Sequence, residues 1–481
     1  MWNSRAVTCA KFETDGGAKV APLLDPFTRE PILVGGKPAR VPVDDVKLIE
    51  INRRDRSVLR DVTSLLRLST PDPDARLAAV IKSGEGAVEN NLSALQTLAG
   101  TEQVPAIKTA IKESIALIQL AKAGDDAESE GLRLSAARTL GDMRSARALA
   151  RLQDLLKAEK DPAARKTLGT AIGSIEHWQS VVEWIGVFFS GLSASSILIL
   201  MALGLAITFG LMGVINMAHG ELMMIGAYAT FLTQQFFVQH FSPQAFNYYF
   251  VVAIPLSFIA AAIVGMILEA TIIRFLYGRP LETLLATWGV SLVLIQAIRY
   301  KFGNNIAVNS PTWLQGSVEI VQDVRFPYNR LFILAFCVLC IGLMYFIVEK
   351  TKLGLLLRAT TQNRQMAASL GVSTRRVDML TFGLGAGLAG LAGCALTQIG
   401  GVTPDMGQNY VIDSFLVVVT GGVGKLAGAL WAGLGLGMIN KFLEPVFATV
   451  WAKVIILIIV VVFIQRRPSG LFPAKGRLAD V

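Results

Sequence analysis

Hydrophobic and polar positions divide the chain at about residue 181. Before this point, short runs with Ala and Leu at helical spacing alternate with charged residues, whereas long stretches after it contain almost no charge. Residues 1–180 carry 50 Asp, Glu, Lys and Arg residues, and residues 181–481 carry only 31. Charge density therefore falls nearly threefold, which indicates that water surrounds the first part and lipid the second.

The second part contains eight or nine stretches that are long enough to cross a membrane as helices. A spanning helix needs about 20 mostly apolar residues. The candidates are residues 185–214, 217–238, 249–273, 283–300, 331–348, 379–398, 411–424, 426–443 and 453–465. Glycine interrupts the short pair 411–424 and 426–443, so these form either two crossings or one crossing with a re-entrant segment.

Lys and Arg in the short loops predict how the helices are oriented. These residues gather in 350–378 and in the tail after Gln465, and they are absent from 239–248 and 399–412. Because cytoplasmic loops carry an excess of positive charge, we expect the first two segments inside and the other two outside, together with 301–329. The net charge of +9 is explained by this orientation rather than by nucleic-acid binding.

The same alternation places residue 184, and with it the N-terminal part, on the outer side. The first residues contain no apolar signal segment, so this expectation requires an export signal upstream of the given start. The alternative is that 185–214 forms a hairpin and the N-terminal domain is cytosolic. We expect the first arrangement.

The N-terminal part is predicted to hold an irregular segment, 1–60, and a helical domain, 61–178. Helical runs begin near Pro71, Gln103, Ser129 and Asp161, about 30 residues apart, and Asp or Ser ahead of most runs suits a helix N-cap. This period predicts HEAT-like repeats of stacked helix pairs. The alternative is a small helical bundle; in either case we expect a docking or spacer module.

No enzyme, cofactor or metal site is predicted. The three histidines, His177, His219 and His240, lie in separate segments without metal-ligand spacing. The run GGVGK at 421–425 lacks the earlier glycine and the Ser or Thr of a phosphate-binding loop. The chain is therefore predicted to be all-α, a polytopic helical membrane protein preceded by the repeat domain.

Three features of the membrane part are candidates for function. Polar residues at 216–221, including Asn216, His219 and Glu221, interrupt an apolar stretch. They either face a pathway, or His219 and Glu221 pair with each other or with backbone at the cytoplasmic boundary, purely for structure. The inside loop 350–378 is predicted to form a short amphipathic helix that ends at Gly371 and docks on a partner, or lies in the lipid headgroups. Dense glycine at 383–393 and 421–437 predicts close helix packing.

These features together resemble a known family. The runs G-L-x-I-T-F-G-L-M-G-V-I-N-M-A-H-G-E (204–221), G-L-x-x-R-A-x-x-x-N-x-x-x-A-x-x-x-G-V (354–372), G-G-V-G-x-x-x-G-A (421–429) and R-P-S-G-L-F (467–472) are similar to those of LivH-type permeases of branched-chain amino acid ABC importers. The resemblance covers the predicted permease domain, 185–473. The long N-terminal extension and GRPLETLLATWGVSLVL (278–294) look most like UrtB-type permeases of urea importers.

The resemblance implies a permease subunit in the bacterial inner membrane, embedded in lipid, that pairs with a second permease subunit. Two cytosolic ATPase subunits would drive it, so the chain itself is not an enzyme, and a periplasmic substrate-binding protein would deliver the solute. The implied ATPase contact comprises Arg358, Asn363, Ala367, Ala368, Leu370 and Gly371. The expected pathway residues are Asn216, His219, Glu221, Thr287, Ser291, Gln296, Thr397 and Gln398.

Urea, or a short amide, is the substrate that this resemblance favours. The alternatives are a branched-chain amino acid permease, which would need charges or helix ends to hold a zwitterion, and a passive channel with a helical regulatory domain.

Overall fold

The computed structural model describes short strands between residues 13 and 42 and then residues 67–122, 127–321 and 323–472. Most of the predicted irregular segment 1–60 lies outside the described residues. Within it, β1 (Glu13–Asp15), β2 (Ala18–Pro22) and β5 (Arg40–Pro42) form an antiparallel sheet, and β3 (Leu33–Val34) pairs with β4 (Lys37–Pro38). The chain forms two compact units, Met1–Gln179 and Ser180–Val481, which divide where the charge density falls.

The helices of the first unit follow one another with short connections. They are α2 (Pro73–Glu85), η2 (Glu89–Asn91), α3 (Leu92–Thr101), α4 (Pro105–Ala121), α5 (Ala127–Asp142), η3 (Ala146–Ala148), α6 (Leu149–Ala158) and the start of α7 (Pro162–Leu205). Asp72 caps α2 through a hydrogen bond from the Asp74 backbone N–H (3.1 Å), as its position before a helical run predicts. Four of the helices begin near the predicted run starts.

A three-helix arrangement recurs in this unit with an offset of 57 residues. The turn glycine Gly84 lies against the Ser114 backbone, and Gly141, 57 residues on, lies against the Ala171 backbone in the same way. A short 3₁₀ turn directly precedes α3 (η2) and α6 (η3). The long helices α4 and α7 each begin with proline. The period that relates equivalent positions is therefore about twice the expected 30 residues, and the HEAT-like classification stays a prediction.

Equivalent glutamates close the connection between helices in both copies. The Glu102 carboxylate accepts the backbone N–H groups of Gln103 and Val104 (3.0 and 3.1 Å), and Glu159 accepts those of the two residues after it. Arg76 also donates to Glu102 (2.7 Å), and this hydrogen bond, with the backbone donors, holds the pKa of Glu102 below its usual range. Buried leucines at equivalent positions, Leu95 and Leu152, fill the two cores.

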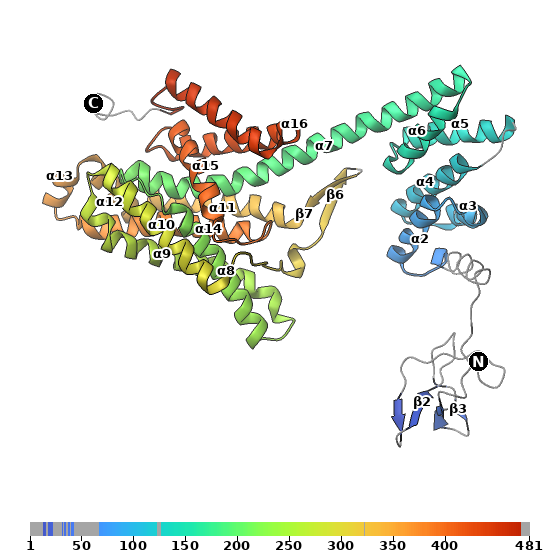
Figure 1. Ribbon diagram of the computed structural model, residues 1–481, viewed down its shortest axis with the longest axis horizontal. Helices are drawn as coiled ribbons and strands as arrows, with labels where there is room; N and C mark the ends of the chain where they lie inside the picture. The colour runs from blue at the N-terminus through green and yellow to red at the C-terminus, as the bar shows by residue number, and fades with distance from the viewer. Residues whose placement is uncertain are drawn as a thin grey trace. The chain divides into compact units, whose positions relative to one another are not determined.

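The second unit is built almost entirely of helices (Figure 1). After α7 come η4 (Ala206–Leu211), α8 (His219–His240), η5 (Ala245–Tyr248), α9 (Tyr249–Thr271), η6 (Ile273–Leu276), α10 (Pro280–Phe302), η7 (Thr312–Leu314), the hairpin β6 (Ser317–Val321) and β7 (Val324–Pro327), α11 (Tyr328–Lys350), α12 (Lys352–Gln362), α13 (Arg364–Ser369), α14 (Thr374–Leu396), α15 (Met406–Gly421) and α16 (Leu426–Arg466).

Six helices in the described part of the chain are long and apolar enough to cross a membrane. They are Pro162–Leu211, Ala245–Thr271, Pro280–Phe302, Tyr328–Lys350, Thr374–Leu396 and Leu426–Arg466. The predicted stretch 217–238 corresponds to α8, and the short pair 411–424 and 426–443 corresponds to α15 and the first part of α16. Ala448 in α16 has a non-helical backbone (φ 59°) that divides the helix after Pro445, so the number of crossings stays a prediction.

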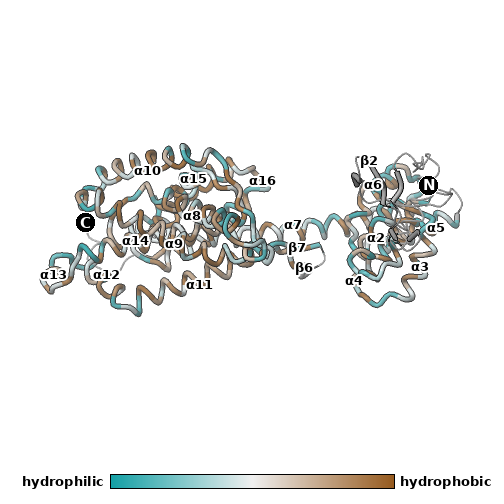
Figure 2. The backbone as a smooth tube through the Cα atoms, turned by 90° about the horizontal axis from the view of Figure 1, so that it is seen from below, coloured by the Kyte–Doolittle hydropathy of each residue, from teal (hydrophilic) through white to brown (hydrophobic). Residues whose placement is uncertain are grey.

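Helices α8, α9 and α14 form the centre of this unit, and glycine lets them approach closely. A Cβ at Gly226 would lie 2.2 Å from the Gly390 carbonyl oxygen, so α8 and α14 touch through backbone. Most of α14 is buried, whereas α9, α10, α11 and α16 expose many large apolar side chains. In Figure 2, hydrophobic residues recur along the backbone of α10 and α11. Apolar residues on an outer face are compatible with lipid as the surrounding solvent.

The contacts between loops agree with the expected alternation of sides. Residues from the three segments expected outside meet: Ile306 and Val402 exchange backbone hydrogen bonds (2.9 and 2.8 Å), and Asn247 accepts from the Thr312 N–H (2.9 Å). On the segments expected inside, Arg364 lies over the Tyr277 ring, 4.5 Å from its centre. In Figure 1, α12 and α13 lie at one end of this unit, and β6 and β7 at the other.

Candidate functional site

The connection between α7 and α8 folds back into the helical unit. Residues 212–218 are not helical, and Gly213 adopts a positive φ of 71° there. His219, the first residue of α8, lies with its Nε2 3.1 Å from the Met201 carbonyl oxygen. Met201 precedes the end of η4 by ten residues, or about 15 Å of helix. The N-terminus of α8 is therefore set well back from that end, and because Ala218 and His219 are fully buried, bulk water does not supply their partners.

Asn216 and two residues of α10 surround this N-terminus. Asn216 Oδ1 accepts the Ala218 backbone N–H (3.0 Å), and the Met217 N–H donates to Thr287 Oγ1 (3.1 Å). Glu221, in the first turn of α8, is hydrogen-bonded to Ser291. Because Thr287 and Ser291 are four residues apart, they lie on one face of α10. Asn216, Glu221, Thr287 and Ser291, predicted from the sequence to face a pathway, are thus brought together.

Buried polar atoms in this cluster have no protein partner among the described residues. They are Asn216 Nδ2, His219 Nδ1 and Glu221 Oε2, on side chains that are 2%, 0% and 1% exposed. His219 and Glu221 therefore do not pair with each other, but His219 Nε2 lies 3.1 Å from the Met201 backbone carbonyl oxygen, as the structural alternative of pairing with backbone expects. An unpaired buried polar atom costs about 1–3 kcal/mol, so such a group is normally paired in the working protein.

A second helix begins at the same place. A Cβ at Gly220 would lie 2.4 Å from the Gly407 carbonyl oxygen, so the first turns of α8 and α15 touch through backbone. Helix α15 has 16 residues, or about 24 Å, which is shorter than the hydrocarbon core. Asp405 stands at its N-cap but does not cap it; its carboxylate accepts both hydrogen bonds from Arg299 Nη2 (2.7 and 2.8 Å).

The sequence predicted the polar residues at the start of α8, but neither the start of α15 nor its contact with α8. The predicted crossing 411–424 starts five residues after the observed start of α15. Asp405 before Met406 is a helix-start signal that could have located it. The pairing of Gly220 with Gly407 had no sequence signal, because glycine density alone does not identify which glycines meet.

Three predicted pathway residues lie away from the junction. Gln296 on α10 is exposed on the outer surface of the unit. Thr397 and Gln398 are buried after the end of α14, where Thr397 Oγ1 donates to the Cys394 carbonyl (2.7 Å) and Gln398 Nε2 donates to Thr397 (3.1 Å). The backbone carbonyl of Gln398 accepts from Asn329 Nδ2 (2.8 Å). This pair lies near the predicted outer loops rather than beside Asn216.

The inside loop forms two short helices instead of one. Asn363 ends α12 and caps α13, accepting the Met366 N–H at its Oδ1 (2.9 Å). Gly371 adopts a positive φ of 83° just after α13, as expected for a helix C-terminus. Of the residues expected at the ATPase contact, Ala367 is buried, and Arg358, which pairs with Glu349, is half exposed. Asn363, Ala368, Leu370 and Gly371 are exposed, Leu370 by 78%.

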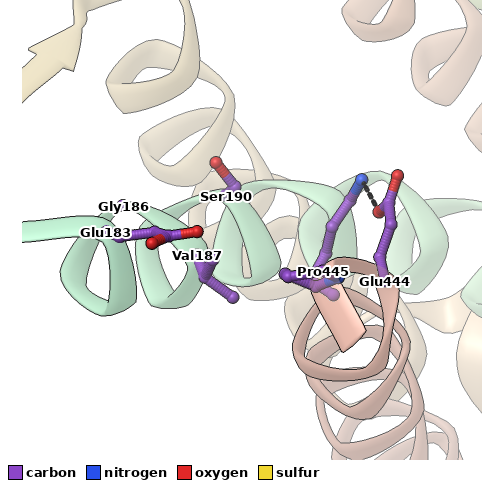
Figure 3. A pocket seen from close by; sticks show the side chains of 7 residues that line it. Glu183, Gly186, Val187, Ser190, Glu444 and Pro445 are labelled. Carbon is purple, nitrogen blue, oxygen red and sulfur yellow. Dashed lines mark hydrogen bonds and ion pairs between the residues drawn. The ribbon is translucent and has the colours of Figure 1, made fainter. Parts of the chain in front are cut away.

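A surface pocket of about 370 Å³ lies elsewhere, between α7 and α16. Figure 3 shows Glu183, Gly186, Val187 and Ser190 of α7 on one side, and Pro445 with the ion pair of Lys441 and Glu444 on the other. The pocket is open to the outside of the unit and has no contact with the α8–α15 junction. The junction, with its buried unpaired groups, is the stronger candidate site.

A helical unit with apolar outer faces, in which two helix N-termini meet beside buried polar groups, is compatible with a membrane transport protein. The family described as the permease component of branched-chain amino acid transport systems matches residues 187–464, more than half of the chain, so the chain belongs to this family of ABC-type transporter permeases.

Among its relatives, the branched-chain amino acid permease protein BraD of Pseudomonas aeruginosa is 28% identical over 60% of this chain and 96% of BraD. The LivH protein of Escherichia coli is 27% identical over 59% of this chain and 93% of LivH, and the LivM protein of the same organism is 23% identical over 58% and 68%. No solved structure matches.

Proposed function

We propose that this chain is one of two permease subunits of an ATP-driven importer in the bacterial inner membrane. A second permease would complete the pathway, two cytosolic ATPase subunits would supply the energy, and a periplasmic binding protein would deliver the solute. Family membership supports the permease role. The similarity to both LivH and LivM, two named permease proteins of one organism, supports a partner of related sequence.

The exposed helix α13 is the observation that supports energy coupling. Met366 and Leu370 are 58% and 78% exposed and lie at one end of the second unit. Amphipathic helices dock their apolar side chains in hydrophobic grooves of partner proteins. Figure 2 shows α13 as a hydrophilic tip that projects from the apolar spans. We infer that the segment from Arg358 to Gly371 contacts the ATPase.

Branched-chain amino acids are the first candidate substrates. The relatives that match nearly their whole length are named as permeases for these solutes. A zwitterion needs opposite charges in its site, and two helix N-termini beside the buried Glu221 supply both signs.

Urea is the second candidate, and two observations favour it. The matches to these relatives leave about two fifths of the chain uncovered, and the family match begins only at residue 187, so the N-terminal unit distinguishes this chain from them. The neutral groups of Asn216, Thr287 and Ser291 suit the carbonyl and amide groups of urea. The sequence of 278–294, which contains both α10 residues, carries the resemblance to urea permeases.

The N-terminal unit is proposed to lie on the periplasmic side as a docking or spacer module. The support is the loop alternation, which requires the segment before α7 to be outside. Protease added to sealed right-side-out vesicles would then digest residues 67–179. Digestion that occurs only in inverted vesicles would place the unit in the cytosol and refute this proposal.

The decisive experiment uses the complete complex, purified with its partner permease and ATPases and reconstituted in liposomes with the binding protein. ATP-dependent uptake of radiolabelled leucine and urea is measured in parallel. Uptake of one solute identifies the substrate, and uptake without ATP would indicate a passive channel. Arg358→Glu and Gly371→Asp should lose the ATPase subunits on purification, whereas Gln296→Ala, on an outer face, should retain them.

A further inference from the structure

The α8–α15 junction contains two positive helix ends that side chains at the N-cap positions do not neutralise. No side chain caps α8 at Ala218 or α15 at Asp405. Each N-terminus carries the equivalent of about half a positive charge. The Gly220–Gly407 contact places both ends together, and the only carboxylate at the N-cap of either helix, Asp405, is engaged by Arg299. The combined field favours an oxygen atom with negative or partial negative charge.

A group of the opposite preference lies one turn into α8. Glu221 is 1% exposed, its Oε2 atom has no partner among the described residues, and no salt bridge to it is found there. Asn216 Nδ2 is likewise buried and unpaired, on a side chain whose Oδ1 is fixed at the α8 N-terminus by the Ala218 N–H. The junction thus combines the positive field of two helix ends and the unused Asn216 Nδ2 donor with an unused acceptor, Glu221 Oε2.

We propose that this junction binds the transported solute, with a carbonyl or carboxylate oxygen at the N-termini of α8 and α15 and an N–H group of the solute at Glu221. The chemistry that fits is an oxygen acceptor and a nitrogen donor separated by one or two carbon atoms. Urea and α-amino acids both have this arrangement. The inference rests on the proposed function, because a solute reaches this depth only if the chain is a permease.

Three residues have defined roles in this site. Glu221 accepts from the ammonium or amide N–H of the solute, and Ser291 holds the glutamate side chain in place. Asn216 donates from Nδ2 to the solute oxygen and orders the α8 N-terminus through Oδ1. The glycines at 220 and 407 bring the two helix ends within reach of one small group, since a side chain at either position would separate them.

The test measures KM for uptake by the reconstituted complex, with leucine and urea as separate probes. Glu221→Gln should raise the KM for leucine at least tenfold, because an ammonium loses its counter-charge, and the KM for urea by a smaller factor of about two to five. Asn216→Asp keeps the hydrogen bond to the Ala218 N–H. It should raise the KM for leucine at least tenfold by repelling the carboxylate, and the KM for urea by a smaller factor of about three to ten, because the Nδ2 donor to the urea oxygen is lost.

Glu269→Gln is the matched control, since Glu269 is also 1% exposed with an unpartnered Oε2 but lies on α9, away from the junction. Its KM should equal that of the unmodified chain. If Glu221→Gln does not assemble with the ATPases, Asn216→Asp carries the test alone.

An unchanged KM in the junction variants, or an equal rise in Glu269→Gln, would overturn the site while the permease role stands. If the unmodified complex takes up neither solute, the proposed substrates fail first, and the site falls with them.

Discussion

Glycine at position 220 should be irreplaceable for a steric reason that can be quantified. In Gly220→Ala, the new Cβ would lie 2.4 Å from the Gly407 oxygen and 2.5 Å from its carbonyl carbon. Favourable contacts between carbon atoms begin near 3.5 Å, so the two helices must separate by about 1 Å. Overpacking of this kind costs about 1–3 kcal/mol, and we expect the upper end because the opposing atoms are backbone.

Replacing glycine by alanine at open helix positions should leave the stability of the fold unchanged or raise it. Gly289 in α10 and Gly342 in α11 have no atoms within 4 Å of a built Cβ. Because alanine is favoured over glycine in helices by about 1 kcal/mol, Gly289→Ala and Gly342→Ala should be neutral or stabilising. The comparison removes any general effect of glycine replacement in a membrane helix.

The assay is thermal unfolding of the purified chain in one detergent, followed by the amount of monodisperse protein that remains after heating. Gly220→Ala should lose its folded fraction at a lower temperature than the unmodified chain, and the two controls at the same or a higher temperature. If Gly220→Ala is as stable as Gly342→Ala, the two N-termini do not touch, and the reasoning about the junction is refuted.

Three further predictions concern the rest of the molecule. Leu152→Ala should destabilise the N-terminal unit by about 2–5 kcal/mol, since Leu152 is fully buried, and should speed its proteolysis in the full chain, with Leu95→Ala giving a similar effect at the equivalent position. Hydrogen bonds lower the pKa of Glu102 in the folded chain, so its carboxylate stabilises the N-terminal unit above the pKa it has in the unfolded chain, and this stabilisation is lost as pH falls through the folded pKa. Glu102→Gln should therefore remove the part of the acid-induced rise in proteolysis that comes from this carboxylate. An unchanged pH profile of proteolysis would contradict this. In intact cells an impermeant maleimide should label Ser242→Cys but should label Gln365→Cys only after permeabilisation; the reverse would invert the orientation.

The main divisions of the fold could be predicted because they depend on local composition. Long apolar runs identify helices whatever they pack against, and the change in charge density locates the boundary near residue 180. The polar run at 216–221 stood out for the same reason, since Asn216 and Glu221 interrupt an apolar sequence. Thr287 and Ser291 were found because they lie on a spanning helix and carry hydroxyl groups.

The features that were missed depend on contacts between distant segments. Gln296 shares helix α10 with Ser291 but lies five residues on, which places it on a different face; the sequence does not state which face is outward. The 57-residue offset of the N-terminal unit is visible in the sequence, where equivalent positions keep Leu95, Glu102 and Pro105 and also Arg76, Leu77, Gly84, Leu92, Gln96 and Leu98. It was missed because the prediction counted each successive helical run, about 30 residues from the next, as one repeat. The start of α15 was missed because Val402–Asp405 is short and polar only at its end.

The pairing of Ile306 with Val402 has a mechanical consequence. Two backbone hydrogen bonds tie the segment that leads into α15 to the segment that follows α10. A shift of the first turn of α15 therefore either moves the segment after α10 with it or breaks both hydrogen bonds. In the predicted orientation, a protein that binds the segment after α10 would be linked through these two hydrogen bonds to a point next to Gly407, so variants that remove them should uncouple its binding from changes at the junction.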